Sequence, residues 1–120
     1  MNLLKPLLLS LCTIVLLAAC GGNDQKSSAG KLQGTWEIKR AEGIMAAMNV
    51  GTIYEFSGNK LTLRVGDIIT PGTTGITDST FSFQPDGHDR KYMYHYRFNG
   101  DTLVADIDIS EGQTFYLVRK

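Results

Sequence analysis

Cysteine is almost absent from this chain of 120 residues, which contains only Cys12 and Cys20. Residues 21–120 therefore form no disulfide among themselves and hold no cysteine-ligated metal. They also offer no cysteine nucleophile. These absences remove the disulfide-stabilised scaffolds and the thiol enzymes from consideration.

Histidine and net charge are also scarce. His88 and His95 are the only histidines, and they lack the His-x-x-x-His spacing of a zinc site, so we expect no metal. The 12 Lys and Arg balance the 12 Asp and Glu, which gives no electrostatic reason to expect nucleic acid as a partner. The glycine-containing segment 72–75 lacks the lysine and the spacing of a phosphate-binding loop, and no cofactor is expected.

A long apolar run is missing as well. The longest run, Leu7 to Ala19, has 13 residues, whereas a membrane-spanning helix needs roughly 20. Lys5 precedes this run, and the small residues Ala18 and Ala19 at its end directly precede Cys20. This order predicts a signal peptide over residues 1–19. A short membrane anchor and a buried helix are the alternatives.

The four residues Leu17-Ala18-Ala19-Cys20 resemble the lipobox of bacterial lipoproteins. The resemblance implies cleavage before Cys20, lipidation of that cysteine and attachment to a membrane of the bacterial cell envelope. Because Gly21 and not aspartate follows the cysteine, the analogy favours the outer membrane in a Gram-negative cell. Residues 20–31 are then a lipidated cysteine with a polar, flexible tether, and residues 32–120 form one folded domain.

Alternating apolar and polar residues predict β-strands in that domain, and glycine marks the turns. Asn99-Gly100 and Gly58-Asn59 predict two-residue hairpin turns. The first predicts the pairs Tyr96–Leu103, Tyr94–Ala105, Tyr92–Ile107 and Lys91–Asp108. The second predicts the pairs Phe56–Leu61, Tyr54–Leu63, Glu55–Thr62 and Ile53–Arg64. A turn at 110–112 directs Phe115, Leu117 and Arg119 to the core; a shorter turn would direct Tyr116 and Val118 there instead.

Seven or eight such strands predict an all-β fold, a single small antiparallel up-and-down β-barrel, with a Greek-key sandwich as the alternative. Residues 44–50 contain the one short helical turn, which could lay Met45 and Met48 on one surface. The turn is too short to stand alone and must pack on the sheet, either as a connector that caps the core or as a mobile lid. Residues 66–79 are expected to be an exposed loop, with a short strand at 68–70 and a turn at Pro71-Gly72.

The start of the domain, Leu32-Gln33-Gly34-Thr35-Trp36, resembles the opening of small lipocalin-like domains of bacterial lipoproteins. The near-terminal Arg119 fits the same pattern. The resemblance implies that Trp36 closes one end of the barrel and that Arg119 lies across its ring. It also implies a protein that binds a small hydrophobic or amphipathic ligand and is not an enzyme.

Aromatic residues on the predicted inner face are the candidate ligand contacts. They are Tyr54, Phe81, Phe83, Tyr92, Tyr94 and Tyr96. The same side chains also suit plain core packing. The alternative is thus a filled barrel that acts as a structural or protein-interaction module of the envelope, through its surface or the 66–79 loop.

Asp106 and Asp108 are the one pair of carboxylates with a spacing that suits acid–base chemistry, because residues two apart on a strand share a face. They lie on the predicted outer face of the strand, whereas Ala105 and Ile107 lie on its inner face. We therefore rank a hydrolase far below the two binding hypotheses.

Overall fold

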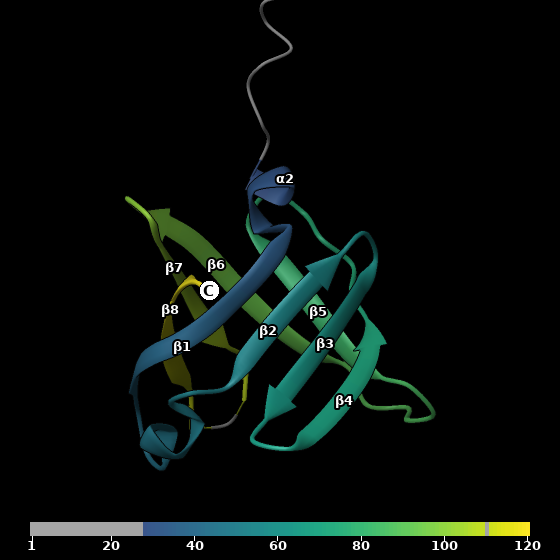
Figure 1. The fold of residues 1–120 in the computed structure, drawn as a ribbon, viewed down its shortest axis with the longest axis horizontal. Coiled ribbons are helices and arrows are strands. Elements are labelled where there is room, and N and C mark those ends of the chain that lie inside the picture. The colour runs from purple at the N-terminus through teal and green to yellow at the C-terminus, as the bar shows by residue number, and fades with distance from the viewer. Residues whose placement is uncertain (1–27, 110) are drawn as a thin grey trace, which may run out of the picture.

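The computed structural model describes residues 28–109 and 111–120. In this part of the chain, eight strands form a closed antiparallel barrel in which each strand pairs with the next and β8 closes on β1 (Figure 1). The strands are β1 (Gly34–Glu42), β2 (Ile53–Ser57), β3 (Lys60–Val65), β4 (Ile68–Thr73), β5 (Thr80–Pro85), β6 (Tyr92–Asn99), β7 (Thr102–Ile107) and β8 (Gln113–Arg119). The predicted all-β, up-and-down barrel is confirmed.

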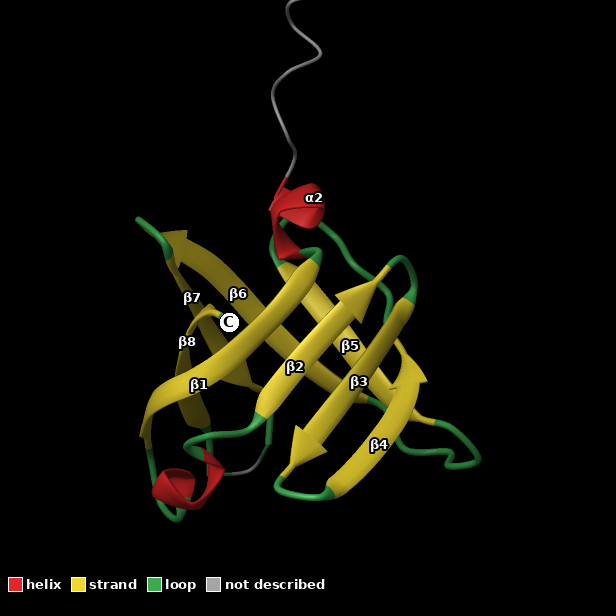
Figure 2. Cartoon of the chain, viewed as in Figure 1, coloured by secondary structure: helices red, strands yellow, loops and turns green. Residues whose placement is uncertain are grey.

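Two short helices accompany the strands (Figure 2). The α-helix α2 (Ser28–Leu32) occupies the end of the predicted tether, so that the ordered domain begins before Leu32. The 3-10 helix η4 (Ala46–Asn49) lies within the predicted helical turn. Within the described residues, no helix has the length and apolar character needed to cross a membrane.

Ala46, and neither Met45 nor Met48, is the residue of this turn that is buried. The side chains of Met45 and Met48 are 65% and 71% exposed. Met45 adopts a left-handed backbone conformation with φ 63° just before η4. The turn of helix is too short to bury more than one position, so the small residue faces the barrel and the two methionines face outward.

The β2–β3 hairpin has the predicted register, with Phe56 opposite Leu61 and Tyr54 opposite Leu63. The β6–β7 hairpin differs from its prediction by two residues. Phe98 lies opposite Leu103, Tyr96 opposite Ala105 and Tyr94 opposite Ile107. The turn is centred on Gly100-Asp101, where Gly100 takes φ 63° and Asn99 remains in the strand, paired with Thr102.

A shift of two residues preserves the face on which every side chain lies, because strand side chains alternate with a period of two. Tyr94 and Tyr96 are therefore buried as expected, and His95 is exposed. The predicted Lys91–Asp108 pair was wrong, since the amide of Asp108 donates to the carbonyl of Met93 at 2.8 Å. His95 lies opposite Asp106.

The short strand predicted at 68–70 is confirmed and extends to Thr73, so the turn predicted at Pro71-Gly72 was wrong. Gly66-Asp67 forms a tight hairpin, and β4 then pairs with β3 along its whole length, through Pro71 and Gly72. Proline is tolerated at position 71 because its backbone faces β5, beyond the last residue pair that β4 and β5 share. There the Pro71 carbonyl accepts from the amide of Asp86 at 3.0 Å. The strands β4 and β5 share only the pairs Gly72–Pro85 and Thr73–Gln84.

The last strand follows the preferred prediction. Phe115 and Leu117 are buried, whereas Tyr116 and Val118 are only partly buried. Ile107 pairs with Gln113, so the connection spans 108–112 and is longer than predicted. Ser110, which belongs to the predicted turn, lies outside the described residues.

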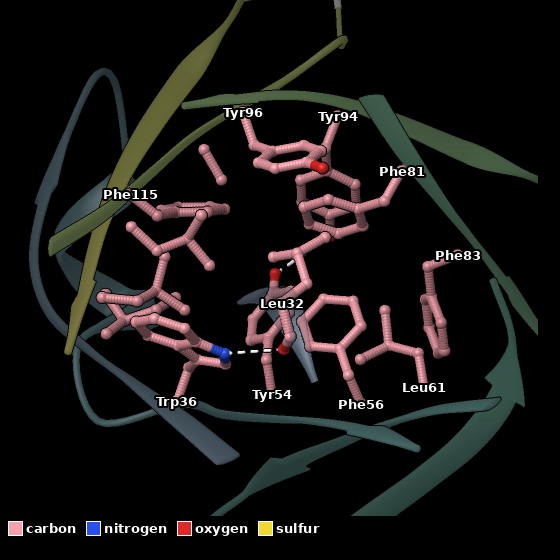
Figure 3. Packing of buried hydrophobic residues seen from close by; sticks show 14 residues of the cluster. Leu32, Trp36, Tyr54, Phe56, Leu61, Phe81, Phe83, Tyr94, Tyr96 and Phe115 are labelled. Carbon is pink, nitrogen blue, oxygen red and sulfur yellow. Dashed lines mark hydrogen bonds between the residues drawn. The ribbon is translucent and has the colours of Figure 1, made fainter. Parts of the chain in front are cut away.

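The barrel has two distinct ends. At one end lie α2 and the turns after β2 and β6, and at the opposite end lie η4 and the turns after β3 and β5 (Figure 1). Aromatic and aliphatic side chains fill the interior between them (Figure 3). Leu32 and Trp36 close the first end, where the indole N–H donates to the Leu32 carbonyl at 2.9 Å.

Candidate functional site at the open end of the barrel

A pocket of about 200 Å³ opens at the end of the barrel that carries η4. Its walls come from most of the strands and from the connection between β1 and β2. The lining residues are Asn49, Thr52, Tyr54, Leu63, Val65, Phe83, Tyr92, Tyr94, Ile107, Gln113 and Phe115. Every one of these described residues is uncharged at neutral pH, so the pocket has neutral walls.

Stacked aromatic rings limit the depth of this pocket. Phe81 stacks on Tyr94 with ring centroids 4.4 Å apart, and Phe56 meets Phe81 edge-on at 5.1 Å. These rings occupy the middle of the barrel (Figure 3). The space that remains is therefore a mouth pocket above a packed aromatic core.

A buried pair of hydroxyls belongs to this pocket. Tyr54 on β2 and Tyr94 on β6 come from opposite walls, and their hydroxyl oxygens lie 2.9 Å apart in a hydrogen bond. The two side chains are only 4% and 2% exposed. Burial raises the pKa of the Tyr94 hydroxyl to about 12 and raises the pKa of Tyr54 well above its usual range. Both hydroxyls therefore keep their protons at physiological pH.

The predicted ligand contacts divide into two groups. Tyr54, Phe83, Tyr92 and Tyr94 line the pocket. Phe81 lies within the aromatic core, and the Tyr96 hydroxyl donates to the carbonyl of Thr77 at 2.7 Å, in the segment between β4 and β5. The remaining contacts, among them Asn49, Thr52 and Gln113, were missed because they meet only when the barrel closes.

Hydrogen bonds hold the rim of the pocket in place. The Asn49 amide donates to the side-chain oxygen of Gln113 at 3.2 Å, and the Gln113 amide donates to the carbonyl of Ile44 at 2.8 Å. These bonds tie the connection between β1 and β2 to the start of β8. A rigid rim on that side favours a permanently open pocket over a lid.

An apolar collar lies along one side of the same end. We use this name for the exposed side chains of the two connections that follow β1 and β3, with the adjoining strand ends: Ile44, Met45, Met48, Val50, Val65, Ile68 and Ile69. Exposed apolar groups gathered at one end of a small domain mark a surface that meets another apolar body.

The closed end carries the predicted Trp36–Arg119 contact. The Arg119 guanidinium lies 4.2 Å from the centre of the indole ring. It also donates to the carbonyls of Gln33 and Lys31, the latter at 2.6 Å. A wide groove of about 480 Å³ runs past these residues and Phe98. Lys31 of α2 lines this groove, and the Arg119 guanidinium in its wall is already bonded to backbone carbonyls.

The outer-face candidates are not brought together as a reactive site. Asp106 accepts from the Thr114 hydroxyl at 2.6 Å and lies 3.6 Å from Arg97, while Asp108 is exposed. His88 and His95 are exposed on different elements. Cys20 and the predicted signal peptide lie outside the described residues.

Comparisons with protein-family models, with curated proteins and with solved structures give no match to this chain. The functional interpretation therefore rests on the geometry of the open end.

Proposed function

We propose that this chain is a lipid-anchored lipoprotein of the bacterial cell envelope whose barrel binds a small apolar or amphipathic ligand at its open end, without catalysis. The observation that carries the proposal is the neutral, aromatic-walled mouth pocket with a buried hydroxyl pair. Ligand sites are typically concave and mostly apolar, with a few fixed polar groups. The lipocalin-like start at Leu32 and the lipobox at Cys20 support the same assignment.

The size of the pocket limits the ligand. A cavity of about 150 Å³ lined by apolar side chains holds one benzene ring, whereas sites for drug-sized molecules measure about 300–1,000 Å³. The mouth pocket, at about 200 Å³, is close to the first value. It accepts one ring or a short alkyl end, and the rest of a larger ligand would remain outside, against the apolar collar.

The position of the anchor is compatible with binding. The chain enters the domain through α2, at the end opposite the pocket (Figure 1). A lipidated Cys20 would thus hold the closed end toward the membrane, by analogy the outer membrane, and leave the pocket accessible.

A titration tests the ligand proposal. Isopropylbenzene, a ring-sized apolar probe, should shift the NMR signals of Tyr54 and Tyr94 with a saturable dose response. Ile107→Trp should lower that affinity at least tenfold, because Ile107 lines the pocket and a larger side chain fills it. Met93→Trp is the matched control on the neighbouring strand, since Met93 faces solvent. Wild-type protein without a saturable shift would refute the pocket as a binding site.

A second candidate is a protein-interaction module of the envelope that uses the apolar collar. The observation in its favour is the exposure of Ile44, Met45 and Met48 on one connection. Photo-cross-linking from position 48 in intact cells should capture a distinct envelope protein. A cross-linkable group at Met93 is the control, and equal capture from both positions would contradict this function.

A further inference from the structure

The buried hydroxyl pair has one proton more than its internal hydrogen bonding uses. Each neutral tyrosine hydroxyl donates one hydrogen bond. Tyr54 and Tyr94 share a single bond at 2.9 Å, so one hydroxyl is the donor and the other the acceptor. The proton of the accepting hydroxyl has no acceptor among the described residues. It lies in a nine-tenths-buried pair on the wall of the pocket.

We propose that this hydroxyl pair is a hydrogen-bond donor to the ligand, so that the pocket selects a neutral molecule with a carbonyl oxygen on a ring-sized apolar body. The inference rests on the proposed function, because it specifies the chemistry of that same pocket. Either tyrosine can supply the free proton, since reversing the bond between them exchanges donor and acceptor. The pair therefore offers one donor to the ligand from either wall.

The neutral walls decide against an anionic ligand. A carboxylate that enters the pocket loses most of its water, and a buried charge is costly without a partner of opposite charge. The described lining residues include no lysine, arginine or histidine to supply one. The raised pKa of Tyr94, about 12, keeps its hydroxyl a donor and not a phenolate at neutral pH. A neutral carbonyl can accept from this pair and needs no counter-ion.

Packing contacts hold the two rings that carry the hydroxyl pair in fixed positions. Tyr94 is held by its stacking on Phe81 at 4.4 Å, and Tyr54 meets Tyr94 edge-on at 5.9 Å. Both rings belong to the packed core, so the hydroxyls cannot turn outward to water without breaking these contacts. Their position is preorganised, which lowers the entropy that a ligand hydrogen bond would otherwise cost.

Three probes of matched size and shape test the inference: acetophenone, isopropylbenzene and benzoate. The first carries a neutral carbonyl, the second has no oxygen and the third is charged. Affinities are measured by NMR titration of wild type, Tyr54→Phe, Tyr94→Phe and the double variant. The matched control is Tyr116→Phe, since the Tyr116 hydroxyl bonds to Glu42 on the outer face.

We expect the double variant to lose about fivefold in acetophenone affinity relative to isopropylbenzene, as the loss of one hydrogen bond predicts. Each single variant should keep the preference, because the remaining hydroxyl still donates. Tyr116→Phe should leave the ratio unchanged, and benzoate should bind most weakly. An unchanged ratio in the double variant, or preferred binding of benzoate, would overturn the inference while leaving the pocket established by isopropylbenzene.

A measurement on the wild type alone covers the case in which the double variant does not fold. The carbonyl carbon of ¹³C-labelled acetophenone resonates downfield when its oxygen accepts a hydrogen bond. We expect a downfield position in the complex relative to acetophenone in an alkane. A bound signal at the alkane position would overturn the inference. If none of the three probes binds wild type, the proposed function fails and this inference fails with it.

Discussion

Among single residues, the hydroxyls of the interior have the largest consequences for how stability depends on pH. The Tyr54 and Tyr94 hydroxyls are nearly inaccessible to solvent and bond to each other. Ionising either one would place a negative charge in the aromatic core. The folded state therefore resists deprotonation far more strongly than the unfolded chain, in which a tyrosine has a pKa near 10.

This difference predicts alkaline destabilisation. A group whose pKa rises on folding contributes stability that is complete below its unfolded pKa and is lost as pH rises toward its folded pKa. For Tyr94 the window runs from about 10 to about 12, and the shift corresponds to roughly 3 kcal/mol. Urea denaturation should give a constant unfolding free energy between about pH 7 and 9 and a steady fall above about pH 10.

The double variant Tyr54→Phe/Tyr94→Phe is the control for that experiment. It lacks both buried hydroxyls, so its unfolding free energy should decline less steeply over the same window. Equal slopes in the two proteins would show that other groups, and not this pair, govern alkaline unfolding.

Residue alternation explains how much of the interior could be predicted. Tyr94 and His95 are neighbours with opposite faces, and the pattern placed the first inside and the second outside. It could not place Tyr54 against Tyr94, because that contact joins strands on opposite walls of the closed barrel. Asn49 and Gln113 were missed for the same reason. Their hydrogen bond joins the end of η4 to the start of β8, two elements far apart in the sequence that meet only in the closed barrel.

Among the elements, the seam between β4 and β5 is the shortest pairing in the barrel. Gly72 lies at this seam, and its backbone passes very close to β5. A Cβ at Gly72 would lie 2.5 Å from a ring carbon of Phe83 and closer still to the carbonyl oxygen of Gln84. The glycine that favoured a turn by composition is therefore required inside a strand for steric reasons.

The same seam gives a stability prediction. Gly72→Ala should destabilise the barrel by about 2 kcal/mol, because the added methyl group forces the backbones of β4 and β5 apart. Gly75→Ala is the matched control, since the nearest atom to its Cβ would be the Ser82 hydroxyl at 3.5 Å. Its effect should stay within about 0.5 kcal/mol. Thermal and urea denaturation measure both, and equal losses would contradict the steric explanation.

Turn composition alone could not fix the register of the hairpin between β6 and β7. Asn99, Gly100 and Asp101 are all turn formers, so two positions of the turn are compatible with the same alternation. The structure places Gly100 first among the central residues. By contrast, the register predicted from Gly58-Asn59 was confirmed, with Ser57 opposite Lys60 and Phe56 opposite Leu61.

At the scale of the whole molecule, the two ends of the barrel are built differently. Leu32, Trp36 and Arg119 close the end at which α2 enters, through an indole hydrogen bond and a guanidinium stacked on the ring. The pocket and the apolar collar occupy the other end. The packed core, which includes Phe56 and Phe81, lies between them, so the proposed anchor and the proposed binding site are at opposite ends.

This separation predicts that binding does not depend on the anchor. Replacing residues 1–20 with a cleavable secretory signal that lacks a lipobox removes the proposed acceptor for lipidation, Cys20, so the protein should move from the membrane to the soluble fraction of the host cell. The pocket lies at the end opposite α2, and the affinity of the soluble form for isopropylbenzene should therefore match that of the lipidated form in detergent within about twofold. Ile107→Trp is the converse variant: it should stay in the membrane fraction and bind isopropylbenzene at least tenfold more weakly. If the variant without the lipobox remains in the membrane after its signal is cleaved, the lipid anchor is contradicted. A soluble form with much weaker affinity would show instead that the acyl chains or the membrane surface complete the binding site.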